Sequence, residues 1–446
     1  MMANTITTAD IRINARWLIP IEPAGVVLDH QAIIIQGSKI VAVVSQTVAD
    51  QKFRTRETVS LPHHVLMPGL INAHGHAAMS LFRGMADDLP LMSWLNEHIW
   101  PVEGAFISEQ FIADGTQLAI AEMLRTGTTT FSDMYFFPEV AAQIAHDIGI
   151  RAQICFPLLD FPTVWGSGPD DYLRKGEALI NTWHADPYIT PAIGPHAPYT
   201  VSDEPLRQAV QLSTDTGAPI QIHLHETAFE VSEATAKSGQ RPAARMVELG
   251  LLGTNTQCVH MTQVNDDDLR QVVEAGAHVI HCPESNLKLA SGLCPVHKLT
   301  NAGVNVALGT DGAASNNDLD LFGELHTAAM LAKVVAGDAS ALSAHQALAM
   351  ATLNGAKALG RGHELGSLVA GKLADIIAVD LSDPFLQPVY DPASHLVYSN
   401  HGRAVSHSWI NGIPQLQDGR LTRIDVPDLM LRVDGWKERI RSYRAP

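Results

Sequence analysis

The sequence predicts an α/β fold, namely a (β/α)8 barrel of the TIM type with a small β-sandwich domain formed by both chain ends. The main observation is a pattern that recurs from about residue 66 to residue 312. In it a short, β-branched apolar run ends in polar residues and a helix-like segment follows. Alternating strands and helices imply a parallel sheet, and eight such units favour a closed barrel. An open doubly wound sheet is the alternative, but no GxGxxG motif follows an early strand.

The eight expected strands are short and each ends in polar residues. In chain order they are VLMPGLINAHGH, GTTTFSDMY, GIRAQICF, YITPAIGPHAPYT, APIQIHLHE, TQCVHMT, AHVIHCPESN and VNVALGTDG. Segments with helical periodicity lie between them, such as residues 110–126, which Gly127 follows as a stop. Residues 343–360 predict the last helix of the barrel.

Both ends of the chain depart from this pattern. Residues 1–65 and 366–446 hold short apolar runs around Gly or Asn-Gly turns, as in AIIIQGSKIVAVVS and HSWINGIPQL. Each end is too short to fold on its own. We therefore expect the two ends to pair into one composite β-sandwich domain, with the barrel of residues 66–365 inserted between them.

Composition and charge exclude several classes of protein. The chain has 30 Lys and Arg against 47 Asp and Glu, a formal net charge of −17, which argues against a nucleic-acid or anionic membrane surface. The four cysteines are scattered without a CxxC pair, as suits a reducing compartment. We see neither a secretory leader nor a stretch of roughly 20 apolar residues, so we expect a cytoplasmic protein.

The polar residues that end the strands are the candidates for an active site, because (β/α)8 enzymes build their sites at the C-terminal ends of the strands. His74 and His76 are two residues apart on one strand and can face the same way. The full set of candidates is His74, His76, His196, His223, His225, Glu226, His260, His281, Glu284 and Asp311.

Four of these candidates have the chemistry of a metal site. Imidazole nitrogens with a carboxylate suit a catalytic divalent metal such as zinc, and His74, His76, His223 and Asp311 would provide them. Each position alone has a structural alternative, since a histidine can simply be hydrogen-bonded at a strand end and Asp-Gly can form a turn. Together, on the first, fifth and eighth strands, they favour metal binding. A bound metal lowers the pKa of water toward neutrality.

Several motifs resemble those of the amidohydrolase superfamily. The segments PGLINAHGH, IHLHE, CVHMT, HCPESNLKLASG and LGTDGAASNNDLDLF are similar in particular to its methylthioadenosine/S-adenosylhomocysteine deaminases, close relatives of chlorohydrolases and guanine deaminases. The similarity covers most of the chain. It implies one zinc per subunit, or another divalent metal such as Fe²⁺, held by His74, His76, His223 and Asp311. The segment YITPAIGPH contains no lysine, which favours one metal over the lysine-bridged pair of other superfamily members.

The resemblance also implies roles for five residues. Glu226 corresponds to the proton-shuttling carboxylate, His260 to the histidine that polarises the attacked centre, and Asp311 to a catalytic group that also contacts the substrate. Glu103, in IWPVEGAF, would bind the ribose hydroxyls, and His196 would contact the substrate together with Glu226.

One of these assignments conflicts with the strand pattern. Glu226 lies three residues past His223, so strict alternation places the two side chains on opposite faces. Glu226 can reach the site only if the strand has already turned. His225 alternates correctly, but the resemblance gives it no ligand role, and we interpret it as structural.

These observations lead to a functional hypothesis with two alternatives. The hypothesis is zinc-dependent hydrolytic deamination at C6 of an adenine nucleoside, S-adenosylhomocysteine, 5′-methylthioadenosine or adenosine, to the inosine-type product and ammonia. The first alternative is a deaminase or chlorohydrolase of another nitrogen heterocycle, guanine or an s-triazine. The second is an inactive barrel homologue that serves as a binding or scaffold protein. The expected partner is a small purine nucleoside, and the resemblance implies a homo-oligomer.

Overall fold

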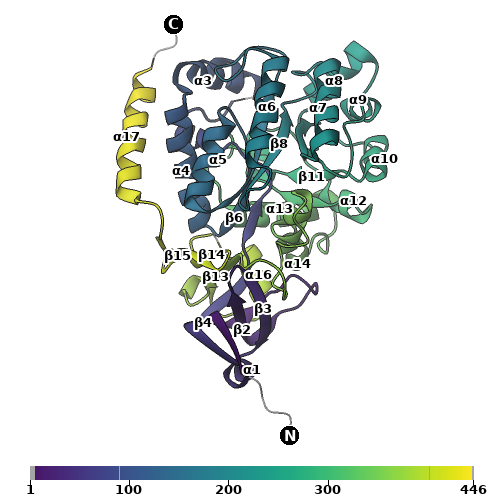
Figure 1. Cartoon of the computed structure of the whole chain (residues 1–446). Helices are drawn as coiled ribbons and strands as arrows, with labels where there is room; N and C mark the ends of the chain where they lie inside the picture. The colour runs from purple at the N-terminus through teal and green to yellow at the C-terminus, as the bar shows by residue number, and fades with distance from the viewer. Residues whose placement is uncertain (1–5, 90, 401, 444–446) are drawn as a thin grey trace.

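The computed structural model describes residues 6–89, 91–400 and 402–443 and shows a barrel with a smaller β-domain at one end (Figure 1). Eight parallel strands form the barrel in simple sequential order, which confirms the predicted fold class. They are β5 (Leu70–Asn72), β6 (Thr128–Met134), β7 (Arg151–Leu158), β8 (Ile189–Pro195), β9 (Ile220–Leu224), β10 (Thr256–His260), β11 (His278–His281) and β12 (Val306–Leu308).

The barrel closes between its last strand and its first. The Ala73 amide donates to the Leu308 carbonyl at 2.9 Å, and the Asp311 amide donates to the His74 carbonyl at 3.1 Å. Gly309 permits this approach, because a Cβ there would lie 2.9 Å from the backbone of His74. Closure therefore brings Asp311 beside His74, although 237 residues separate them in the sequence.

Helices follow the strands and pack around the barrel, and Figure 1 shows α4, α5 and α6 side by side. The helix expected at residues 110–126 is α4, from Glu109 to Arg125. The helices of the barrel wall are α4, α5 (Pro138–Ile148), α6 (Pro169–Trp183), α7 (Asp203–Thr216), α8 (Ala228–Ser238), α9 (Pro242–Glu248), α10 (Asp266–Ala275), α11 (Pro283–Lys288), α12 (Val296–Asn301), α13 (Leu321–Ala336), α14 (Ala344–Met350) and α15 (Leu353–Ala358).

The single helix expected at residues 343–360 is wrong, because the chain breaks into α14 and α15 at Thr352 (φ −131°, ψ −93°). The Ala351 carbonyl accepts a hydrogen bond from the Ile71 amide of β5 at 2.8 Å. This carbonyl therefore accepts a hydrogen bond from a barrel strand and not from the next turn of a continuous helix.

Both chain ends form one eight-stranded mixed sheet in the order β16-β15-β14-β13-β4-β1-β2-β3. Strand β4 pairs antiparallel with β13, which confirms that the two ends associate. Ile13, Ile33, Leu66, Ile376 and Trp409, from five of these strands, share one apolar core. The strands are β1 (Thr7–Leu18), β2 (Leu28–Gln36), β3 (Lys39–Ser45), β4 (Phe53–Pro68), β13 (Ile376–Asp380), β14 (Val405–Ile410), β15 (Ile413–Gln417) and β16 (Arg420–Leu421). The domain boundaries at 65/66 and 365/366 stay a prediction.

The remaining helices connect these parts. Helix α1 (Gln46–Lys52) belongs to the end domain, α16 (Pro392–Tyr398) packs against α13 and α14, and α17 (Val426–Ser442) lies beside α4 (Figure 1). After β5 the chain forms 3-10 helix η1 (Ala77–Phe82), α2 (Leu91–Ser93), π-helix η2 (Trp94–Ile99) and α3 (Trp100–Phe106). Among the described residues, no helix is both long and apolar enough to cross a membrane.

Candidate active site

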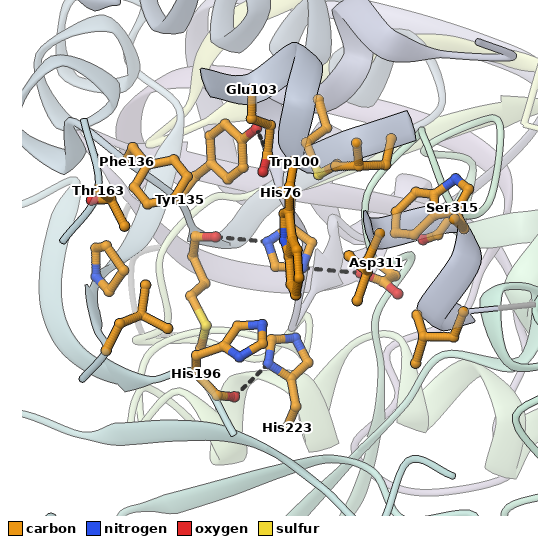
Figure 2. A pocket seen from close by; sticks show the side chains of 18 of the residues that line it. His76, Trp100, Glu103, Tyr135, Phe136, Thr163, His196, His223, Asp311 and Ser315 are labelled. Atoms are coloured by element: carbon orange, nitrogen blue, oxygen red, sulfur yellow. Dashed lines mark hydrogen bonds and ion pairs between the residues drawn. The ribbon is translucent and has the colours of Figure 1, made fainter. Parts of the chain in front are cut away.

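A cavity of about 460 Å³ opens at the C-terminal ends of the barrel strands (Figure 2). Its volume lies within the range of small-molecule sites. Segments after seven of the eight strands contribute to its wall, together with η1, η2 and α3. Seven of the predicted site residues line it, namely His76, Glu103, His196, His223, Glu226, His260 and Asp311, and His74 is fully buried against them.

The four predicted metal ligands lie around His74, which belongs to two groups of close donor atoms: His74, His76 and Asp311 form one, and His74, His223 and His260 form the other. His74 Nε2 lies 3.2 Å from His223 Nε2, and Asp311 Oδ1 lies 3.1 Å from His76 Nε2 and 3.6 Å from His74 Nε2. Figure 2 shows His76 pointing toward Asp311, and His223 beside His196. The four side chains come from the ends of β5, β9 and β12, as the sequence predicts.

The hydrogen bonds that the three histidines make through Nδ1 are compatible with metal binding through Nε2. Their Nδ1 atoms donate to oxygen acceptors, from His74 to Gln221 Oε1 at 2.7 Å, from His76 to the Met134 carbonyl at 2.6 Å and from His223 to the His196 carbonyl at 2.7 Å. A neutral imidazole that donates through Nδ1 presents a lone pair at Nε2. Burial lowers the pKa of His74 and His223, which keeps both neutral. For His76, burial is outweighed by the Asp311 carboxylate, which raises the pKa to about 9, so this ring has to release its Nε2 proton before it can bind a metal. Lone pairs this close repel each other unless a cation lies between them, so this donor set fits zinc.

Asp311 is held in place by its own surroundings. Its backbone has φ +62°, Ser285 Oγ donates to its Oδ2 at 2.7 Å, and the Gly312 amide donates to its Oδ1 at 2.8 Å. Burial alone would raise the pKa of Asp311, but the neighbouring His74 and His76 side chains hold it well below its usual range. The group is therefore a carboxylate in this state, and its Oδ1 faces the Nε2 atoms of His76 and His74.

A sharp turn brings Glu226 to the cavity. Strand β9 ends at Leu224, and His225 has φ +54°, so the alternation of side chains stops one residue before Glu226. Both carboxylate oxygens of Glu230 accept amide hydrogens of this turn, from His225 at 2.9 Å and from Glu226 at 2.8 Å. The expectation from strict alternation is therefore wrong here, because the strand has turned before Glu226.

The surroundings of Glu226 suit proton transfer. Burial, followed by the nearby Asp311 carboxylate, raises the pKa of Glu226 to about 8. A carboxyl group with a pKa near neutrality can both accept and release a proton.

His260 stands next to Glu226 at the end of β10. Its backbone has φ +76°, and its Nδ1 donates to Asn286 Oδ1 at 2.9 Å. Its Nε2 lies 3.9 Å from Glu226 Oε2. Burial lowers the pKa of His260, so the ring is neutral and its tautomer is set by its partners.

Glu103 lies across the cavity from the barrel strands, on α3. Tyr135, which directly follows β6, donates its hydroxyl to Glu103 Oε1, and Figure 2 shows the two side chains meeting at the cavity edge. Burial raises the pKa of Glu103 to about 7, against the hydrogen bond from Tyr135. Glu103 lines the cavity, and its carboxylate can accept hydrogen bonds from a ligand.

The structure places the other candidates as follows. His196 lines the cavity, donates from Nδ1 to Thr200 Oγ1 at 3.0 Å and supports His223 through its carbonyl. His225 points away, where its Nε2 accepts from the Ala243 amide at 3.0 Å, in agreement with a structural role. His281 and Glu284 do not line the cavity; Glu284 accepts from Thr327 at 2.8 Å.

Five supporting residues were not predicted from the sequence. They are Tyr135, Gln221, Glu230, Ser285 and Asn286. Three of them stand in the polar ends of the expected strands, in FSDMY and HCPESN, where the same rule that found the histidines applies. Gln221 is inside β9 and Glu230 is on α8, and no motif indicates their partners.

The fold and this donor set define a class of protein: barrel hydrolases that use a bound metal to activate water. A model of the amidohydrolase family matches residues 65–413. A curated 5-methylthioadenosine/S-adenosylhomocysteine deaminase of Saccharophagus degradans is 52% identical over 98% of this chain and 98% of its own. The chain belongs to the amidohydrolase family.

Two solved structures share the fold. A zinc-bound adenosine deaminase from Xanthomonas campestris is 47% identical, covers 98% of this chain and 100% of its own, and superposes with a TM-score of 0.97. An atrazine chlorohydrolase from Arthrobacter aurescens with zinc has a TM-score of 0.89 at 23% identity, over 96% of this chain and 99% of its own. The second likeness concerns the fold alone.

Proposed function

We propose that this protein is a zinc-dependent hydrolase that deaminates an adenine nucleoside at C6, giving the inosine-type product and ammonia. One observation carries the proposal: His76, His223 and Asp311 each lie close to His74 at the cavity, with Glu226 lining the same cavity. The names of the deaminase relatives, from Saccharophagus degradans and Xanthomonas campestris, support the same chemistry.

The substrate lies between the metal ligands and α3. Glu103 accepts hydrogen bonds from the vicinal 2′- and 3′-hydroxyls of the ribose, because a carboxylate offers two oxygens and several lone pairs. Tyr135 fixes this carboxylate through its hydroxyl. His196 contacts the ligand from the cavity wall, with its ring held by Thr200.

The chain's own residues then move the protons. Zinc in this site supplies a Lewis acid that lowers the pKa of a water molecule. Asp311 accepts a hydrogen bond from that water and directs it toward C6. Glu226 takes a proton from the water and gives it to a ring nitrogen, which makes C6 more electrophilic. The second proton of the water passes through Asp311 to the departing amine, which leaves as ammonia. His260, whose Nδ1 donates to Asn286, stabilises the negative charge on the attacking oxygen when its Nε2 carries a proton.

The two alternatives are weaker. Guanine and s-triazine substrates have no ribose, and the Tyr135–Glu103 pair then has no partner to bind. An inactive scaffold protein has no need of a complete donor set, yet the metal ligands, Glu226 and His260 are all in place.

A substrate panel tests this proposal. Purified, zinc-loaded protein is given S-adenosylhomocysteine, 5′-methylthioadenosine, adenosine, guanine and atrazine, and ammonia or chloride release is followed. We expect ammonia from at least one adenine nucleoside and none from guanine. If the protein turns over guanine or atrazine but no adenine nucleoside, the proposal is wrong and the first alternative is favoured.

Two further features belong to the proposal. The four cysteines are free thiols buried in the fold, which supports a reducing, cytoplasmic location. The homo-oligomer expected from the resemblance stays a prediction. Size-exclusion chromatography with light scattering measures it directly.

A further inference from the structure

The wall of the cavity beyond Glu103 and Tyr135 is apolar. It comes from the segments after β6 and β7 and consists of Phe136, Pro157, Leu159, Phe161, Pro162, Thr163 and Val164. Figure 2 shows Phe136 and Thr163 on the same side as Tyr135, away from Asp311 and Ser315. A ribose bound to Glu103 therefore has this wall, hereafter the 5′ wall, beside it.

Part of the 5′ wall is exposed although it is apolar. Phe161 is 44% exposed and Val164 is 45% exposed. Aromatic and aliphatic groups at the mouth of a cavity gain stability when an apolar ligand covers them. The wall thus favours a ligand with an apolar group at this end.

The charges around the cavity have one sign. Among the described residues that line it, the side chains other than histidine that carry charge are the carboxylates Glu103, Glu226 and Asp311. The basic residues next along the chain are engaged elsewhere: Lys175 donates to the Trp165 carbonyl and lies 3.4 Å from Asp171, and Arg174 also pairs with Asp171. A ligand carboxylate beside the 5′ wall therefore has no Lys or Arg side chain to pair with among the described residues that line the cavity.

From this wall we infer that the 5′ substituent of the preferred nucleoside is a small uncharged thioether, such as methylthio, and that the enzyme discriminates against the homocysteine group. This inference rests on the proposed function and narrows it. A methylthio group covers the 5′ wall with an apolar surface. Homocysteine carries an ammonium and a carboxylate, and the carboxylate has no cation opposite it in the described wall.

The test compares kcat/KM for 5′-methylthioadenosine, S-adenosylhomocysteine and adenosine with the zinc-loaded full-length protein. We expect 5′-methylthioadenosine to exceed each of the others at least tenfold, since one apolar group in such a pocket is worth roughly 10- to 200-fold. A ratio under ten between 5′-methylthioadenosine and S-adenosylhomocysteine overturns the inference and leaves the proposed function intact. If none of the three nucleosides is deaminated, the proposed function itself fails.

A pair of variants tests the physical cause. Val164→Arg places a cation at the 5′ wall, whereas Val164→Gln changes the same position to a polar but uncharged side chain. We expect the Arg variant to raise the ratio of S-adenosylhomocysteine to 5′-methylthioadenosine activity at least tenfold above that of the Gln variant. Equal ratios in the two variants contradict the assignment of this wall to the 5′ substituent. Circular dichroism confirms that both variants are folded.

Discussion

At the scale of single residues, the site depends on the hydrogen-bond partner that orients each functional side chain. Gln221, the Met134 carbonyl and the His196 carbonyl each accept a hydrogen bond from the Nδ1 atom of one histidine, which leaves Nε2 of that ring as its second donor atom. Ser285 and Asn286 are neighbours on α11, and they hold Asp311 and His260 respectively. One helical turn therefore positions two groups that the proposed mechanism places at the same water.

In the proposed function, Glu103 is the residue that binds the ribose and so selects a nucleoside. Glu103→Gln should lower kcat/KM for adenosine about 30-fold, because a hydrogen bond to a charged group is worth about 1.5–3 kcal/mol. For 2′,3′-dideoxyadenosine, which lacks both hydroxyls, the same variant should change kcat/KM about threefold or less. Equal losses on the two substrates would remove Glu103 from the ribose site.

At the scale of elements, the turn between β9 and α8 decides the position of Glu226. Glu230, in the first turn of α8, binds the backbone amides of His225 and Glu226 with its two oxygens. Burial is the largest influence on Glu230 and raises its pKa to about 7, while these hydrogen bonds lower it. The Glu230 carboxylate thus stabilises His225 in a left-handed backbone conformation. That conformation costs about 1–3 kcal/mol for a residue other than glycine.

This role predicts the behaviour of Glu230→Gln, whose amide can accept with only one oxygen. We expect kcat to fall about tenfold while KM changes about threefold or less, because Glu226 is displaced but the ribose contacts stay. Glu233→Gln is the matched control, since Glu233 lies on the same helix and pairs only with exposed Lys237 in the described contacts. Equal kinetics in both variants would show that the turn does not depend on Glu230.

The elements also show which parts of the fold can be predicted from sequence. The strands and the histidines at their ends follow from local periodicity and from the rule that barrel sites lie at strand C-termini, so His74, His76, His223 and Asp311 could be placed together. The direction of the Glu226 side chain could not be predicted, because the apolar–polar alternation of so short a strand does not reveal the left-handed turn at His225. The break at Thr352 was missed for a related reason: a long-range hydrogen bond between Ala351 and Ile71 causes it.

At the scale of the whole molecule, the barrel and the end domain are joined through a buried ion pair. Arg151 of β7 is 1% exposed and binds Asp375, 6% exposed, at 2.6 Å and 3.1 Å. Arg151 also donates to the Pro187 carbonyl at 2.8 Å, and Asp375 accepts from the Asn411 amide at 2.8 Å. The two parts therefore share buried polar partners as well as apolar contacts.

Removal of Arg151 should destabilise both parts. Arg151→Met leaves the Asp375 carboxylate buried without its cation, and the free energy of unfolding in urea should fall by about 3–5 kcal/mol. Arg270→Met removes an exposed arginine that pairs with Asp267, and it should change that free energy by about 0.5 kcal/mol or less. A separate, unchanged unfolding step for the barrel in Arg151→Met would contradict this coupling.

The central claim, that one zinc ion held by four residues drives nucleoside deamination, is tested most directly by a metal titration. Protein stripped with a chelator is titrated with zinc while ammonia release from 5′-methylthioadenosine and bound zinc are measured on the same samples. The account predicts that activity is lost on stripping, rises in proportion to bound zinc and reaches its plateau at one zinc per chain, whereas His223→Ala stays inactive. Full activity in the stripped protein, or a plateau only at two zinc ions per chain, would contradict it.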